Sequence, residues 1–578
     1  MTKRHSAVAE VDNLGGKISK RQIPSTTWEN AKSQSSKVQK SLRSRRAGLW
    51  QLGFGVRRFL FCSLIIGHWS LVISPKLSAA TFDLATATIA DINAAFDKGA
   101  LTSEKLVQLY LARIEAYDQK GPAINTIITL NSKALETARA LDTERKTKGP
   151  RSPLHGIPVM VKDVYDTFDM PTSGGFKPMA KSQPWRDSFV VNRLRQAGAI
   201  ILAKLNQADW YAVMPAGAST IKGQVLSPYN LKKFTGYSSS GTGAAMAAWF
   251  STIGLGSDTG GSITIPSANS NLVGFATSHG LVSRTGMMWR SPSQENGGPM
   301  GRSVYDCAAV LDLIAGYDPA DLPTQNGIGK IPTEHYTSFV SKDGLKGARI
   351  GVLREMFRTG ALHTEGNALA EKALADFKTA GAILIDPVLT GLDLIETQAD
   401  AGASRFEVAA AINKYLSGLP ADAPVRTVDE MIAKAGDTTI KPNIIKANQA
   451  GSLDHNPEFA ATLKHQEVVR RALTALMDKY QLDALVLPFR TATIETIPVP
   501  GGFNHDTRNN LSSYTGLPTI IVPGGFFPSD GMPFAIQFLG RPFSEPTLIR
   551  VASGFEAATG HRKPAPLTPA LPGESFSY

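Results

Sequence analysis

The chain has 578 residues, enough for a large hydrophobic core, and 42% of them are hydrophobic, as in an ordinary globular protein. Of its formal charge of +12, +11 belongs to the first 80 residues, which hold 14 Lys and Arg against three Asp and Glu, whereas residues 81–578 hold 47 against 46. This balance argues against a polyanion as partner of the main part of the chain, and we expect no nucleic acid to bind there.

Residues 1–80 have the pattern of an export leader. Arg57 and Arg58 precede an apolar stretch of 15 residues over 59–73, and Ser78 and Ala80 then occupy the small-residue positions that a signal peptidase reads. A stretch of that length is short for spanning a bilayer and fits the apolar region of a signal peptide. We expect cleavage near Ala80 and an exported domain, periplasmic or secreted, without stable membrane insertion. A retained anchor, an organellar presequence and a twin-arginine signal are the alternatives.

The sequence contains two cysteines, Cys62 and Cys307. Cys62 would leave with the leader, so no disulfide can form within residues 81–578. The apolar surroundings of Cys307 predict a small buried residue on a helix.

From residue 81 onward, helical and strand patterns alternate. Thr102 can cap a helix whose apolar residues share one face. A buried strand is predicted over Val159–Val161, a helix over Phe189–Gln196, and further strands over 199–203, 348–353, 382–385, 484–487 and 519–522. This alternation predicts an α/β fold, with one large domain over 81–578 and a central twisted mixed β-sheet covered by helices on both faces.

The segment from about residue 318 to 480 is mostly helical and more variable in character. Thr364–Thr379 is its clearest amphipathic helix. We expect this segment to supply pocket walls or a lid.

Lys162 directly follows the apolar strand and is therefore hard to keep in contact with water. It is either a lysine at the edge of the sheet or a buried amine whose pKa falls from ~10.4 toward neutrality, so that it can act as a base.

Residues 236–266 carry two groups of serines among glycines: Ser238–Ser240, and Ser262 after a glycine pair. The small residues over 244–252 predict a packed helix between them, followed by a strand over 253–256. Glycines beside a serine allow backbone N–H groups to approach a ligand atom. The pattern favours a nucleophile beside an oxyanion hole, and two Gly/Ser loops around a buried helix are the structural alternative.

Several other catalytic motifs are missing from the sequence. It has no Gly-x-Ser-x-Gly elbow, no His-Glu-x-x-His zinc site, no Walker loop and no Gly-x-Gly-x-x-Gly. These absences argue against a serine hydrolase of the usual elbow type, a zinc peptidase and a nucleotide-dependent enzyme.

Lys162, Ser238 and Ser262, separated by 76 and 24 residues, together resemble the amidase signature family. The resemblance extends over about residues 85–565 and is supported in the same order by three further segments: Gly156–Asp163, Gly298–Val304 and Thr515–Pro523.

The resemblance implies an amidase that hydrolyses a small-molecule or peptide amide to an acid and ammonia or an amine, without a metal or other cofactor. Ser262 would be the nucleophile, Ser238 the bridging serine, on a cis Tyr237–Ser238 bond, and Lys162 the base. The remaining implied residues are the oxyanion-hole donors Thr259, Gly260 and Gly261, with the N–H of Ser262, and the pocket residues Trp210 and Tyr211, for which core packing is the alternative.

The sequence departs from the family pattern at Tyr237, Ser240 and Thr264. Thr264 stands where the family often has Arg, which removes an ion-pair partner for Asp258, and we interpret Asp258 as a structural residue that orients the loop. Two other functions remain: a catalytically silent binding protein on the same scaffold, and an amidotransferase subunit that acts on charged tRNA.

Overall fold

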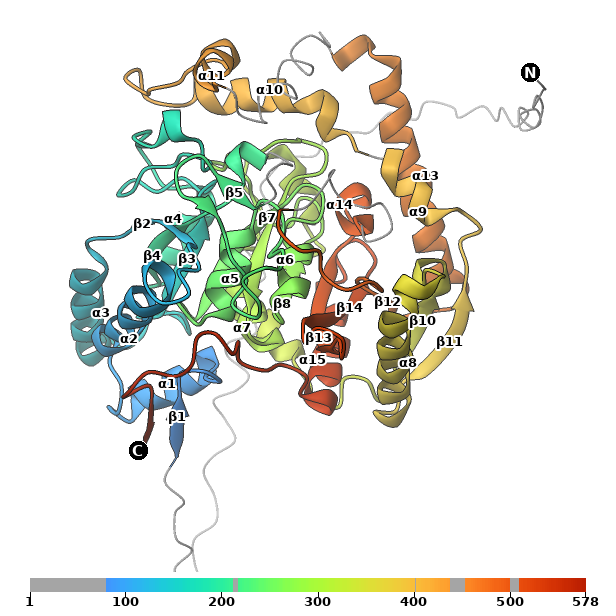
Figure 1. The fold of residues 1–578 in the computed structure, drawn as a ribbon, viewed down its shortest axis with the longest axis horizontal. Coiled ribbons are helices and arrows are strands. Elements are labelled where there is room, and N and C mark those ends of the chain that lie inside the picture. The colour runs from blue at the N-terminus through green and yellow to red at the C-terminus, as the bar shows by residue number, and fades with distance from the viewer. Residues whose placement is uncertain (1–79, 212–216, 401, 437–452, 499–508) are drawn as a thin grey trace, which may run out of the picture. The chain divides into compact units, whose positions relative to one another are not determined.

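The computed structural model describes residues 80–211, 217–400, 402–436, 453–498 and 509–578. The expected leader lies outside these residues, apart from its last position. Residues 77–578 form one compact unit (Figure 1). In the described part of that unit, no helix combines the length and the apolar character needed to cross a membrane.

A mixed sheet of 11 strands forms the centre of the described fold. Its strand order is β11-β10-β12-β14-β13-β8-β9-β7-β3-β4-β2. β3 runs parallel to both of its neighbours, β4 and β7, and β10 runs parallel to β11 and β12, whereas the other neighbouring pairs are antiparallel. The strands in chain order are β2 Ile127–Leu130, β3 Pro158–Lys162, β4 Ile200–Leu205, β7 Ile253–Asp258, β8 Val273–Ala276, β9 Asn296–Gly301, β10 Arg349–Leu353, β11 Ile383–Val388, β12 Ala484–Pro488, β13 Thr519–Phe526 and β14 Pro533–Leu539.

Helices cover both faces of the sheet, and β13 shows this most clearly. Ile520 and Val522 belong to the main core cluster, which also contains Val551 of α15. Ile521 instead packs in a second cluster with Ile265 of α6. Because successive side chains of a strand point to opposite faces, α15 and α6 lie on opposite sides of the sheet, and the expected α/β architecture is confirmed.

The helices named below have the following bounds: α2 Ser103–Ile114, α3 Ala134–Lys148, α4 Phe189–Gln196, α5 Ser240–Ala247, α6 Thr264–Asn269, α7 Val304–Ile314, α8 Thr364–Thr379, α10 Ser404–Ser417 and α15 Glu545–Thr559.

Local sequence signals predicted several of these elements. Thr102 caps α2 as expected, with its side chain accepting a hydrogen bond from the Lys105 N–H. The bounds of α4 and α8 match the predicted ranges. Cys307 is buried on α7, as its apolar surroundings predicted.

The helix predicted over 244–252 is wrong in its bounds. In the structure α5 begins at Ser240 and ends at Ala247. Trp249 has a φ of 60°, in the left-handed region that an α-helix does not contain, so the helix ends before it. The glycines at 241 and 243 do not prevent helix formation, because the helix is buried on all sides.

Candidate active site

The proposed base lies at the end of a central strand. β3 ends at Lys162, which is fully buried, and its parallel partner β7 ends at Asp258. Val161 of β3 pairs with Leu255 of β7, so the carboxyl ends of the two strands lie side by side. This edge of a parallel sheet is where α/β proteins place their ligands, and the turn that carries Ser262 leaves from it.

Two serine hydroxyls hold the Lys162 amine. Its Nζ lies 2.7 Å from Oγ of Ser238, at the start of the turn before α5, and 2.8 Å from Oγ of Ser257 on β7. Ser238 is itself buried. The structure thus brings together the predicted base and the predicted bridging serine, which are 76 residues apart in the sequence.

Burial changes the acid strength of this amine. Removal from water lowers the pKa of Lys162 from 10.5 to about 7, while the negative charges of Glu295 and Asp258 act in the opposite direction. A substantial part of the amine is therefore uncharged near neutral pH, and an uncharged amine can accept a proton. The alternative of a surface lysine is excluded, because no part of the Lys162 side chain is exposed.

Asp258 organises the turn that carries Ser262. Its carboxylate accepts hydrogen bonds from the backbone N–H groups of Gly261 at 2.7 Å, Ile263 at 2.7 Å and Thr264 at 3.2 Å. The hydroxyl of Ser513 donates a further bond at 2.5 Å. The interpretation of Asp258 as a loop-orienting residue is confirmed, and backbone donors take the place of an arginine partner.

The hydrogen bonds of Asp258 engage the N–H of Gly261, one of the three residues expected to form the oxyanion hole. The Gly261 N–H donates to Asp258 and also lies 2.9 Å from Oγ of Ser513, so it would have to leave both partners to bind an oxyanion. Gly261 has a φ of 99°, which favours glycine. We keep Thr259, Gly260 and the N–H of Ser262 as proposed donors, as the family resemblance implies.

Ser262 itself lies in the turn between β7 and α6 and is 6% exposed. Among the described residues, no direct hydrogen bond joins Ser262 to Ser238. Catalytic hydrogen bonds are often long in unliganded enzymes and shorten when substrate binds, so this separation does not remove Ser262 from the proposed relay.

The expected cis bond between Tyr237 and Ser238 is wrong. In the described residues the cis peptide bonds are Asp386–Pro387 and Ile497–Pro498, and Tyr237–Ser238 is trans. The trans form is the lower-energy state for a residue that does not precede proline, and with it Ser238 already reaches Lys162.

The sequence reasoning missed two polar residues beside the amine. Ser257 is the second hydrogen-bond partner of Lys162. Glu295, which just precedes β9, is completely buried and is the first of the charges that raise the pKa of Lys162. A glutamate beside the glycine-rich strand 296–301 was the available signal, because a chain rarely buries an ionised side chain without a partner.

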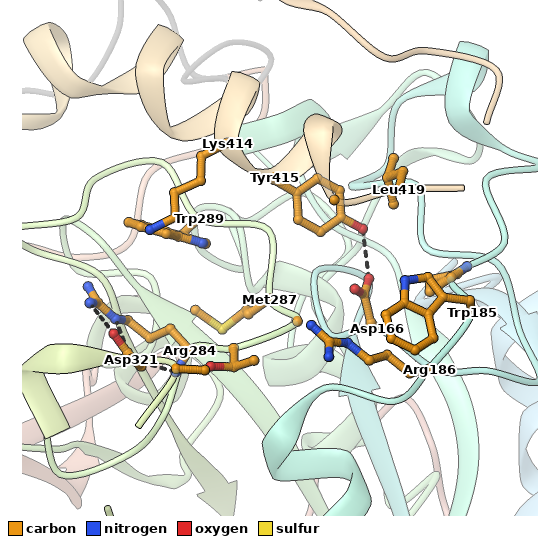
Figure 2. Close-up of a pocket in the computed structure, with 15 residues that line it drawn as sticks. Asp166, Trp185, Arg186, Arg284, Met287, Trp289, Asp321, Lys414, Tyr415 and Leu419 are labelled. Carbon is orange, nitrogen blue, oxygen red and sulfur yellow. Dashed lines mark hydrogen bonds and ion pairs between the residues drawn. The ribbon is translucent and has the colours of Figure 1, made fainter. Parts of the chain in front are cut away.

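The structure also has a cavity of about 240 Å³, and Lys162, Ser238 and Ser262 are not among the residues that line it. Figure 2 shows Met287 in its middle, Asp166 and Trp185 on one side, and Trp289 and Lys414 on the other. The hydroxyl of Tyr415 donates a 2.7 Å hydrogen bond to Asp166. Burial raises the pKa of Asp166 to about 7.

The predicted pocket residues are Trp210 and Tyr211, and Trp210 is not among the residues that line the cavity. Trp210 is buried and packs edge-on against Tyr415, with ring centroids 5.9 Å apart, so it supports the cavity wall from behind. The backbone of Tyr211 ends a short 3₁₀ turn, and its side chain lies outside the described part of the structure.

The helical segment after residue 318 reaches both the cavity and the catalytic turn. Lys414 and Tyr415 of α10 line the cavity. At the other end of α10, the Ser404 N–H donates to Gln294, whose side chain donates to the Thr259 carbonyl. The expectation of a pocket wall from this segment agrees with the position of α10.

Comparisons with known proteins identify the family of the chain. A family model described as Amidase matches residues 105–549. The chain is 33% identical to a probable amidase of Arabidopsis thaliana over 88% of its own length and 98% of the relative. It is 31% identical to one of the subunits of the glutamyl-tRNA(Gln) amidotransferase of Moorella thermoacetica, over 83% and 98%.

Solved structures show the same relationship. The peptide amidase of Stenotrophomonas maltophilia is 33% identical and superposes with a TM-score of 0.74, covering 83% of this chain and 98% of its own. An amidase family protein from Bacillus anthracis is 31% identical, with a TM-score of 0.73 and coverage of 83% and 92%. The chain belongs to the amidase signature family, whose α/β enzymes hydrolyse amide C–N bonds.

Proposed function

We propose that this chain hydrolyses peptide amides and related small carboxylic amides through an acyl-enzyme on Ser262. One observation carries the proposal: the fully buried amine of Lys162 lies 2.7 Å from the hydroxyl of Ser238, at the sheet edge from which the Ser262 turn leaves. The similarity to a peptide amidase supports peptide amides as the first substrates to test.

In the proposed reaction, Oγ of Ser262 attacks the amide carbonyl carbon. Its proton passes to the Ser238 oxygen, and the Ser238 proton passes to Nζ of Lys162. The backbone N–H groups of Thr259, Gly260 and Ser262 stabilise the resulting oxyanion. The same path then returns the proton to the leaving nitrogen, the C–N bond breaks, and the acyl group stays on Ser262.

Water completes the proposed cycle. A water molecule attacks the acyl carbon while Ser238 and Lys162 again take up the proton. The carboxylic acid leaves when the proton returns to Ser262. The cycle needs no group beyond these side chains, the backbone donors and water.

A panel of peptide, fatty, aryl and short aliphatic amides tests the proposal, with ammonia or amine release as the readout. An activated fluorophosphonate should label Ser262 of the wild type and leave Ser262→Ala unlabelled. An unlabelled wild type that hydrolyses none of these amides would support the silent binding protein instead.

A tRNA-dependent amidotransferase subunit is the second candidate, because of the 31% identity to such a protein. The nearly balanced charge of residues 81–578 argues against it. Purification of the natural protein together with tRNA or with a second subunit would favour this candidate.

We also infer that the protein is exported and that its leader is removed near Ala80. The apolar stretch over 59–73 and the small residues after it support this inference. N-terminal sequencing of protein from the natural host tests it, and a mature chain that still begins before residue 59 would refute it.

A further inference from the structure

Glu295 is a buried carboxylate that takes no part in the steps of the proposed reaction. It lies just before β9, whose Asn296 and Gly297 pair with Asp258 and Ser257 of β7. Its side chain has no exposed surface. A carboxylate in such a place is costly unless nearby groups compensate its charge, so its contacts indicate what it does.

The contacts of Glu295 lead to both parts of the proposed catalytic centre. The hydroxyl of Thr259, the first residue of the proposed oxyanion loop, donates a short hydrogen bond to Oε2 of Glu295. The backbone N–H of Arg290 lies 3.3 Å from the same oxygen. Burial raises the pKa of Glu295, whereas the positive charge of Lys162 and the hydroxyls of Thr259 and Ser257 act in the opposite direction. Ser257 is also the residue whose hydroxyl lies 2.8 Å from Nζ of Lys162.

We propose that Glu295 is a positioning residue for the amide hydrolysis proposed above: it places a buried carboxylate next to the strand segment that carries Ser257, the hydrogen-bond partner of Lys162, and its bond to Thr259 holds the start of the oxyanion loop. This inference rests on the proposed function. According to this inference, the side chain of Glu295 acts both on the base Lys162 and on Thr259, the first residue of the oxyanion loop.

The other charged groups around Lys162 have separate partners. Asp258 also raises the pKa of Lys162, after Glu295, but its oxygens already accept the hydrogen bonds of the Ser262 turn. Asp163, the next residue in the chain, forms a buried ion pair with Lys204 at 3.0 Å. Burial raises the pKa of Tyr165, and the negative charge of Glu295 raises it further.

The effect of removing the charge has a definite sign. Burial lowers the pKa of Lys162, and the negative charge of Glu295 raises it. In Glu295→Gln that charge is gone, so only Asp258 still opposes the effect of burial. The Lys162 pKa then falls, and the uncharged amine persists to lower pH. The acid limb of the kcat/KM profile should therefore move to lower pH in this variant.

Matched variants separate the two roles. Glu295→Gln removes the charge but keeps an oxygen that can accept the Thr259 hydrogen bond. Thr259→Val removes that bond and keeps the charge, so kcat should fall while the acid limb stays in place. Glu545→Gln is the control, because Glu545 is also buried, binds the Ser278 N–H at 2.7 Å and is not among the groups that shift the Lys162 pKa.

The experiment measures the pH dependence of amide turnover and of the rate at which an activated fluorophosphonate inactivates each purified variant. A lower acid limb in Glu295→Gln, absent in Glu545→Gln, supports the proposal. An unmoved limb in folded Glu295→Gln overturns it and leaves the hydrolase function intact. An inactive, unlabelled wild type overturns both.

Glu295→Asp covers the case in which Glu295→Gln does not fold. The shorter side chain keeps the charge and draws back from Thr259, so kcat should fall with the acid limb near its wild-type position. A limb that moves down although the charge is retained would refute the proposed role of the charge.

Discussion

Replacing Lys162 with methionine should make the enzyme inactive but more stable near neutral pH. Methionine has a similar length and no charge, so it fits the apolar end of β3. Burial lowers the pKa of Lys162 from 10.5 to about 7, a difference of about 3.5 pH units. At ~1.4 kcal/mol per unit, the buried amine costs the wild type about 5 kcal/mol of folding free energy at low pH.

The pH dependence of this cost follows from proton binding. Between about pH 7 and pH 10.5 the unfolded chain holds more protons on this lysine than the folded chain does. Wild-type stability therefore rises with pH across this window, and the cost is nearly complete at pH 7 and nearly absent above pH 10.5. The methionine variant lacks this term at every pH.

Two further effects enter the comparison. The variant loses the hydrogen bonds of Nζ to Ser238 and Ser257, together worth about 2–3 kcal/mol. Without the Lys162 charge, the pKa of buried Glu295 rises further, so the variant loses stability as pH increases. We expect the variant to be more stable than wild type by about 2 kcal/mol at pH 7, and less stable by about the same amount near pH 10.

Urea denaturation followed by tryptophan fluorescence measures both values. The comparison uses the difference between variant and wild type, because the other titrating groups contribute to both chains. Lys146→Met, at an exposed lysine of α3, measures the effect of the same exchange at the surface. A difference between Lys162→Met and wild type that is equal at pH 7 and pH 10 would refute the reasoning.

Three other expectations concern catalysis and stability. Ser262→Ala should lower amide turnover by at least ~10³-fold with an unchanged circular dichroism spectrum, and retained turnover would exclude Ser262 as the nucleophile. Wild-type kcat/KM should rise with pH through about pH 7, where burial places the pKa of Lys162, and a flat profile across that range would contradict an uncharged lysine base. Arg113→Met should lower the free energy of unfolding by about 3–5 kcal/mol, because it leaves Glu574, its buried partner at 2.7 Å, without a cation. Lys120→Ala breaks an exposed ion pair with Glu115 of the same 2.7 Å length and should not change the melting temperature measurably, so equal effects of these two variants would refute the argument from burial.

Much of the fold follows from short-range patterns in the sequence. The cap at Thr102, the bounds of α4 and the apolar strand that ends at Lys162 depend on residues within one or two turns of each other. Local backbone preferences and hydrophobic periodicity decide such features. The same short-range view placed α5 too late, because it contained no sign that Trp249 would adopt a left-handed conformation.

The candidate site depends both on residue patterns in the sequence and on contacts that form only in the folded chain. The sequence by itself singled out Lys162, Ser238 and Ser262 as candidates, through the glycines beside the serines and through the resemblance to the amidase signature family. Only the tertiary structure decided that Lys162 is fully buried, that Ser238 reaches it, and that the charge of Glu295 opposes the effect of burial on the Lys162 pKa. The physical reason is that desolvation and charge coupling depend on atoms that are close in space, and the atoms around Lys162 come from strands and turns that are tens to more than a hundred residues away in the chain.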